Sequence, residues 1–118
     1  MNPAEFVTAI EAAVAQAAVD DVLSLLNSPP GRRPSESLMK LSEFYKGLSS
    51  GEQAMIADIV KLSVDESVFG FLCVLEGVRA IENGPGKGEL VLSYEGDVSV
   101  HINRGMDLHD LYNMRQSE

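Results

Sequence analysis

The stretch of sequence that decides the fold reads VFGFLCVL and runs from Val68 to Leu75. Large apolar side chains occupy nearly consecutive positions here, so a helix through them is apolar on every side and must be buried. We therefore expect a central helix from about Asp65 to Glu82. Ser63 and Glu66 have the spacing of a capping box and are expected to open it.

Small residues recur along this predicted helix at spacings of three or four, which places them on one stripe. They are Gly70, Cys73, Gly77 and Ala80. Glycine inside a helix costs up to about 1 kcal/mol relative to alanine, so two glycines on one stripe indicate that another backbone packs close. A neighbouring helix is the favoured partner, and a second copy of the chain, giving a homodimer, is the alternative. Cys73 is expected to be a small core residue.

The N-terminal region has apolar residues at helical spacing from Phe6 to Leu25, and Pro3 suits a first helical position. Asp20 and Asp21 could instead cap a second short helix. Residues 3–27 therefore form either one helix or two.

Two further helices are expected before the central one. The first begins at Ser35 or Ser37, and its apolar side carries Leu38, Leu41, Phe44, Tyr45 and Leu48. The second is opened by a capping box, either Ser50 with Gln53 or Ser49 with Glu52. Its apolar residues are Met55, Ile56, Ile59 and Val60.

Two alternating segments, Glu89–Glu95 and Asp97–Asn103, predict a β-hairpin. Residues paired across a hairpin lie on the same face of the sheet. Pairing Tyr94 with Val98 places the apolar residues of both strands on one face, and it requires a three-residue loop, 95–97. In this register His101 points away from the core.

A short last helix is expected after the hairpin, capped by Asp107, with Leu108, Leu111 and Tyr112 facing inward. The final residues, 116–118, are expected to be frayed. The sequence thus predicts a single α+β domain over residues 1–118. It has four to five N-terminal helices, one antiparallel β-hairpin and a short C-terminal helix.

The chain of 118 residues carries a net charge of −9, from 18 acidic and 9 basic residues. Such a chain is repelled by the phosphates of nucleic acids and by anionic membranes, and a basic protein partner is compatible with its charge. The longest apolar run is far shorter than the roughly 20 residues of a membrane helix. With one cysteine and no basic leader, the expected location is the cytoplasm.

Three side chains on the predicted central helix form the first candidate binding group. Arg79 has Glu76 and Glu82 three residues away on either side. They form either surface ion pairs or an anchored arginine that is presented to a ligand carboxylate or a partner protein. His101 and His109, the only histidines, are the other candidates for binding.

None of these residues has the spacing of a known catalytic or metal-binding motif. The histidines lack the His-x-x-x-His and Glu-x-x-His patterns, and the glycine-rich turn at 83–88 lacks the residues of a phosphate-binding loop. We therefore expect no catalytic residue, no cofactor and no metal, and we favour a protein that is not an enzyme.

Three segments carry a resemblance to known proteins. They are residues 69–82, residues 88–94 with the sequence GELVLSY, and residues 108–113 with the sequence LHDLYN. Together they are similar to small uncharacterised bacterial proteins, some of which resemble toxin-immunity proteins. The resemblance spans residues 69–113, and it implies a bacterial source and no defined activity.

The charge, the small size and the lack of catalytic motifs favour a protein-binding function. The protein would be an immunity-type inhibitor or an adaptor that docks an acidic face on a basic partner. The alternative is a small-molecule-binding domain or minor enzyme, with a pocket between the central helix and the hairpin. Arg79, His101 and His109 would provide the polar lining of that pocket.

Overall fold

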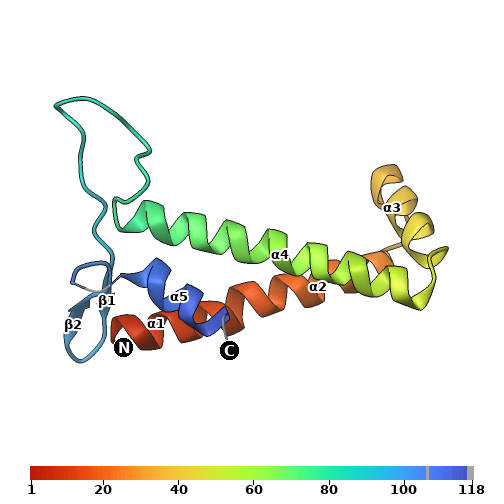
Figure 1. Cartoon of the computed structure of the whole chain (residues 1–118), viewed down its shortest axis with the longest axis horizontal. Coiled ribbons are helices and arrows are strands. Elements are labelled where there is room, and N and C mark those ends of the chain that lie inside the picture. The colour runs from red at the N-terminus through yellow and green to blue at the C-terminus, as the bar shows by residue number, and fades with distance from the viewer. Residues whose placement is uncertain (106, 117–118) are drawn as a thin grey trace. The chain divides into compact units, whose positions relative to one another are not determined.

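The computed structural model describes residues 1–105 and 107–116 (Figure 1). These residues are mostly helical, with one antiparallel two-stranded hairpin and a short C-terminal helix, which confirms the predicted α+β class. They group into two compact units. The first unit comprises Met1–Val14 and Glu66–Glu118, and the second comprises Ala15–Asp65. The single domain over the whole chain stays a prediction.

The N-terminal region forms one helical run, which settles the choice between one helix and two. It consists of α1 (Pro3–Ile10), the π-helical segment η1 (Glu11–Gln16) and α2 (Ala17–Asn27). The backbone stays helical at both junctions, with φ −58° and ψ −46° at Glu11 and φ −64° and ψ −41° at Gln16. Asn2 caps the start of the run through a capping box with Glu5.

Helix α3 (Glu36–Lys46) lies in the second unit and begins after Ser35, whose hydroxyl accepts the Leu38 N–H at 3.2 Å. Of the two predicted starts, Ser35 is therefore the correct one. The buried hydroxyl of Ser42 donates to the carbonyl oxygen of Leu26 at 2.7 Å and joins α3 to α2.

The apolar side predicted for α3 is only partly buried. Tyr45 is buried, but Leu41 and Phe44 are exposed. The predicted apolar side is therefore covered at Tyr45 and open to solvent at Leu41 and Phe44. Helical spacing identifies a shared face, and it does not say whether anything covers that face.

Helix α4 (Ser50–Leu75) replaces two predicted helices with one of 26 residues. Its capping box is formed by Ser49 and Glu52, with hydrogen bonds of 2.9 and 3.2 Å. The predicted second cap at Ser63 is wrong, because the Ser63 hydroxyl donates to the Ile59 carbonyl oxygen at 2.8 Å. A serine inside a helix can bond in this way to the preceding turn without ending the helix.

Helix α4 ends at Leu75, seven residues before the predicted end at Glu82. Gly77 adopts a positive φ of 78°, and the Val78 N–H donates to the Cys73 carbonyl oxygen at 3.0 Å. The Gly77 N–H donates to Val74 at 3.1 Å, which completes a Schellman motif. The predicted stripe of small residues is therefore wrong: Gly77 ends the helix, and Ala80 lies in the loop beyond it.

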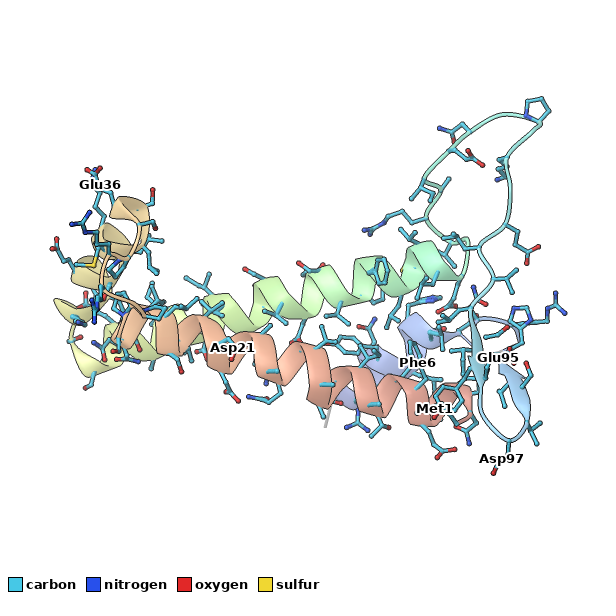
Figure 2. All side chains as sticks on the ribbon, turned by 180° about the vertical axis from the view of Figure 1, so that it is seen from behind. Met1, Phe6, Asp21, Glu36, Glu95 and Asp97 are labelled. Carbon is cyan, nitrogen blue, oxygen red and sulfur yellow. The ribbon has the colours of Figure 1, made fainter. Side chains whose placement is uncertain are left out.

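Strands β1 (Ser93–Glu95) and β2 (Ser99–His101) form the predicted antiparallel hairpin. The register is two residues away from the predicted one, because Tyr94 pairs with Val100 rather than with Val98. The loop still has three residues, now 96–98, and Asp97 lies at its tip (Figure 2). A shift of two residues keeps every side chain on its predicted face.

Helix α5 (Leu108–Gln116) packs on α1 in the first unit, as Figure 1 shows. Leu108 and Tyr112 are buried and Leu111 is half-buried, which confirms the predicted inward side. The Arg115 guanidinium forms an ion pair with Glu11 and a 3.2 Å hydrogen bond with the hydroxyl of Thr8. Residues 117 and 118, for which fraying was predicted, lie outside the described residues.

The core of the first unit comes from three helices, α1, α4 and α5, and from the residue directly after β2. Its most deeply buried large side chains are Val7, Leu72, Ile102, Leu108 and Tyr112. Over the described residues, no helix is long and apolar enough to cross a membrane.

Candidate functional site

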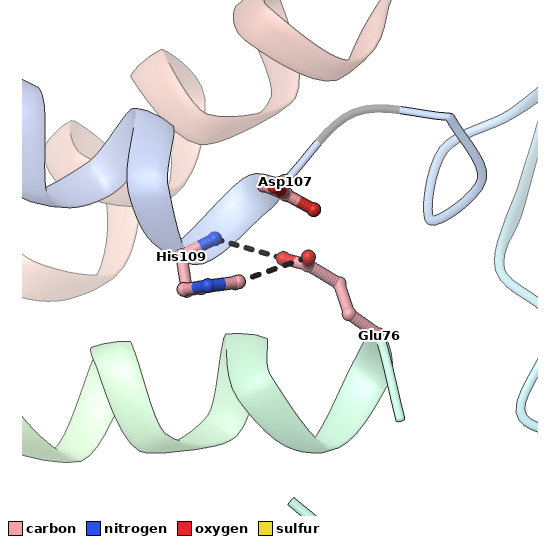
Figure 3. Close-up of side chains that lie close together, drawn as sticks. All are labelled: Glu76, Asp107 and His109. Atoms are coloured by element: carbon pink, nitrogen blue, oxygen red, sulfur yellow. Dashed lines mark hydrogen bonds and ion pairs between the residues drawn. The ribbon is translucent and has the colours of Figure 1, made fainter. Parts of the chain in front are cut away.

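Glu76 and His109 form the closest polar pair among the predicted site residues (Figure 3). Glu76 directly follows α4, and His109 lies in the first turn of α5. One carboxylate oxygen of Glu76 accepts the backbone N–H of His109 at 2.8 Å. The other lies 3.1 Å from the ring Nδ1. A carboxylate is favoured at this place, because the first N–H groups of a helix carry partial positive charge.

Three neighbours surround this pair. Asp107 offers a carboxylate oxygen, and one oxygen or nitrogen from each of Glu76, Asp107 and His109 lies within 4.8 Å of the others. The Nε2 of His109 lies 3.6 Å from the Asp110 carboxylate. The ring of Phe69 meets the imidazole edge-on, with 5.7 Å between the ring centroids. The imidazole is thus held by contacts from both helices.

Arg79, Glu76 and Glu82 do not share a helix face, which corrects the arrangement that the sequence suggested. Because α4 ends at Leu75, Arg79 and Glu82 lie in the following loop and not on one helix face. The Arg79 guanidinium lies against Gly70 of α4. The Glu82 carboxylate accepts the Gly88 N–H at 2.7 Å and closes the loop on itself.

Cys73 is buried, as the sequence predicted, and it lies near these charges. Burial raises the pKa of the Cys73 thiol, the positive charge of Arg79 opposes that rise, and the charges of Glu76 and Asp110 add to it. A buried thiol with a raised pKa is a poor nucleophile. This agrees with a packing role for Cys73.

His101 is separate from the other candidates. It lies at the end of β2, opposite Ser93, and its side chain is half-buried. Of the five predicted binding residues, the structure thus joins Glu76 and His109 by direct contacts, while His101 lies at the hairpin.

A cavity of about 460 Å³ lies between the C-terminal end of α4 and the loop that follows it. Its lining includes two cations, Arg79 and Lys87, and three carboxylates, Glu76, Glu82 and Glu89. Neither His101 nor His109 lines it, so only Arg79 of the predicted polar lining is present. The cations can pair with an anionic group of a ligand, and the carboxylates can pair with a cationic group.

Asn103 supports the wall of this cavity through three hydrogen bonds. Its amide donates to the carbonyl oxygens of Leu75, at 2.6 Å, and Leu90, at 2.9 Å. Its side-chain oxygen accepts the Leu92 N–H at 3.0 Å. One side chain thereby joins the end of α4 to the segment that enters the hairpin. The sequence around Asn103 does not predict this role, because the hydrogen-bond partners of Asn103 are 11 to 28 residues away along the chain.

The part of α4 that belongs to the second unit carries an exposed apolar stripe that the sequence did not predict. We define it as Met55, Ile59 and Leu62, whose side chains are 64%, 56% and 62% exposed. Spacings of four and three residues place them on one side of the helix. Helix geometry places the exposed carboxylates of Glu52 and Asp58 on either side of the stripe. The sequence shows the helical spacing of Met55 and Ile59, but spacing alone does not say whether a face is buried or exposed.

Comparison with known proteins adds nothing to this geometry. No family model, no curated protein and no solved structure matches the chain.

Proposed function

We propose that this protein is a protein-binding domain, an immunity-type inhibitor or adaptor, and that it docks on a basic partner. The observation that carries the proposal is the exposed apolar stripe of Met55, Ile59 and Leu62. Fully burying one such side chain stabilises a protein by about 1.5–3 kcal/mol. Clustered apolar side chains rimmed by polar residues typically mark surfaces that a partner covers.

The charges around the stripe define the chemistry of the partner. Glu52 and Asp58 flank the stripe, and the whole chain carries a charge of −9. The matching surface has an apolar centre and a rim of Lys and Arg. A rim of this kind speeds encounter and sets the dependence on salt, while the apolar centre supplies most of the affinity.

Helix α3 offers a second set of exposed apolar side chains in the same unit. Leu41 and Phe44 are 56% and 62% exposed and lie three residues apart. An aromatic side chain is a frequent anchor at interfaces. We include both residues in the proposed binding surface.

The proposed location is the cytoplasm. The one cysteine of the chain is a buried free thiol, which suits a reducing compartment.

The experiment is a pull-down from a lysate of the source organism with three baits: the wild type, Met55→Ser/Ile59→Ser and Phe71→Ser. Phe71 is the matched control, because it lies on the same helix, outside the stripe, and is 62% exposed. A partner bound by the wild type and by Phe71→Ser, but lost from the stripe variant, supports the proposal. Circular dichroism of each bait verifies folding.

Salt dependence tests the electrostatic part of the proposal separately. Raising salt from about 0.1 M to about 1 M shortens the Debye length from about 10 Å to about 3 Å. The affinity for a basic partner then falls, mainly through slower association. If no protein distinguishes the stripe variant from the control bait, the protein-binding proposal is wrong.

A second candidate function rests on the cavity beside α4. Its volume of about 460 Å³ suits a small ligand, and a lining of two cations, Arg79 and Lys87, with three glutamates suits a ligand that carries both charges, such as an amino acid. A thermal-shift screen of amino acids and other small zwitterions tests this candidate. A stabilising compound that loses its effect on Arg79→Gln supports ligand binding, and a screen without any stabilising compound contradicts it.

A further inference from the structure

Glu76, Asp107 and His109 bring together three potential metal ligands from two separate parts of the chain (Figure 3). Glu76 lies just after α4, Asp107 immediately precedes α5 and His109 lies in its first turn. All three belong to the first unit. A carboxylate oxygen of Glu76 and the Nδ1 of His109 are already 3.1 Å apart. Two ligands of a tetrahedral zinc ion with bonds of about 2.1 Å lie roughly 3.4 Å apart, so this pair needs little movement.

The surroundings hold these groups in place. The Glu76 side chain is 6% exposed and that of His109 is 16% exposed. The His109 backbone N–H fixes one Glu76 oxygen at 2.8 Å and leaves the other beside Nδ1. Phe69 packs edge-on against the imidazole. Metal sites depend on such outer contacts, because they fix the direction of each ligand atom.

Asp110 occupies the outer position that a metal-binding histidine usually requires. A histidine that binds a metal through one ring nitrogen commonly directs the other toward a carboxylate. Here the Nε2 of His109 lies 3.6 Å from the Asp110 carboxylate, while Nδ1 faces Glu76. This arrangement assigns Nδ1 to the metal and Nε2 to the outer contact.

The charge of the cluster also favours a cation. Three carboxylates surround one imidazole: those of Glu76, Asp107 and Asp110. In the ion pairs recorded for residues 1–105 and 107–116, neither Glu76 nor Asp110 has a lysine or arginine as its partner. A divalent ion would neutralise part of this negative charge.

We propose that Glu76, Asp107 and His109 bind a divalent transition-metal ion of the zinc class. The ligands are one carboxylate oxygen from each acid and Nδ1 of the imidazole. One nitrogen and two oxygens suit Zn²⁺, whereas Mg²⁺ and Ca²⁺ prefer oxygen alone. Asp107 is exposed, which leaves the open side of the ion accessible to water.

The test is calorimetric titration of Zn²⁺ into the full chain after chelator treatment, at about pH 7, where carboxylates are charged. We expect one ion per chain and a higher melting temperature with Zn²⁺, because binding favours the folded state. Mg²⁺ at the same concentration should leave the melting temperature unchanged.

Asp107→Asn is the decisive variant, because an exposed side chain can be changed without disturbing the fold. It and His109→Gln should each weaken Zn²⁺ binding by at least about tenfold. His101→Gln is the matched control, since it removes the other histidine, and it should bind as the wild type does. If the wild type binds no Zn²⁺, or if Asp107→Asn and His109→Gln bind as tightly as the wild type, the proposed site does not exist.

Discussion

The guanidinium of Arg79 lies against the α-carbon of Gly70. A Cβ atom built at position 70 would lie 2.5 Å from the Arg79 Nη1, and the next two nearest atoms, at 3.5 and 3.9 Å, belong to the same guanidinium. The space that this glycine leaves is therefore filled by a side chain from the loop after α4, rather than by the close helix backbone that the sequence suggested.

Gly70→Ala should therefore be tolerated. The end of a flexible arginine can move aside, and alanine in a helix is favoured over glycine by up to about 1 kcal/mol. We expect stability near that of the wild type for Gly70→Ala alone. We expect a gain of up to about 1 kcal/mol in an Arg79→Ala background, measured by urea unfolding. A large loss in that background would mean that backbone, and not Arg79, packs on Gly70.

Asn103→Ala should destabilise the protein more than most changes of a half-buried polar residue do. It removes three hydrogen bonds, to Leu75, Leu90 and Leu92, and leaves those backbone groups unpaired. We expect a loss of about 1–2 kcal/mol in the free energy of unfolding, because the bonds to Leu75 and Leu92 are partly buried, whereas water can replace the exposed bond to Leu90. Asn103→Asp should be similarly unfavourable, since a carboxylate then faces two carbonyl oxygens. Stability within about 0.5 kcal/mol of the wild type would show that water replaces these bonds.

The sequence predicted the elements of this fold better than it predicted their ends and surroundings. Apolar periodicity located α1, α2 and α5, and alternation located the hairpin with a three-residue loop. The end of α4 was missed because glycine at position 77 fits either a close helix contact or a left-handed helix terminus. Local sequence does not choose between these two, since the choice depends on the hydrogen bonds of Val78 and its neighbours.

The candidate site was only half predictable for a similar reason. Glu76 and His109 were both singled out, but 33 residues separate them, and no motif spacing links them. Asp107 was predicted as a helix cap only. Its place beside the other two depends on how the start of α5 meets the end of α4 within the first unit. Motif spacing describes ligands on one element, and it cannot find a cluster assembled by tertiary packing.

The contribution of the capping box at the start of α4 to the stability of the protein should depend on pH. The Ser49 backbone N–H, and then the Ser49 hydroxyl, lower the pKa of Glu52. A carboxyl group whose pKa is lower in the folded state than in the unfolded state stabilises the folded protein. This contribution is fully present at pH values above the unfolded pKa. That contribution is lost as the pH falls through the lowered folded value.

Glu52→Gln should therefore be less stable than the wild type at about pH 7, and the difference should shrink as the pH falls through the lowered pKa of Glu52. Urea unfolding of both proteins, once at neutral pH and once in acid, measures this change. Ser49→Ala, which removes the hydroxyl cap itself, should cost about 1 kcal/mol at pH 7. A constant difference between Glu52→Gln and the wild type at both pH values would contradict a lowered pKa.

Ile59 and Leu72 lie on the same helix, α4, but truncating them should change the stability of the protein by very different amounts. Leu72 is 1% exposed, so Leu72→Ala leaves a cavity and should cost about 2–5 kcal/mol in the free energy of unfolding. Ile59 is mostly exposed in the apolar stripe, so Ile59→Ala removes little packing and gains helix propensity. We expect the stability of Ile59→Ala to stay within about 0.5 kcal/mol of that of the wild type.

A loss of 2 kcal/mol or more from Ile59→Ala would mean that this chain, or a second copy of it, already covers the stripe in solution. In that case the stripe would be part of a core or a homodimer rather than a surface kept for another protein. Repeating the unfolding at several protein concentrations separates these two cases, since only a dimer gains stability with concentration.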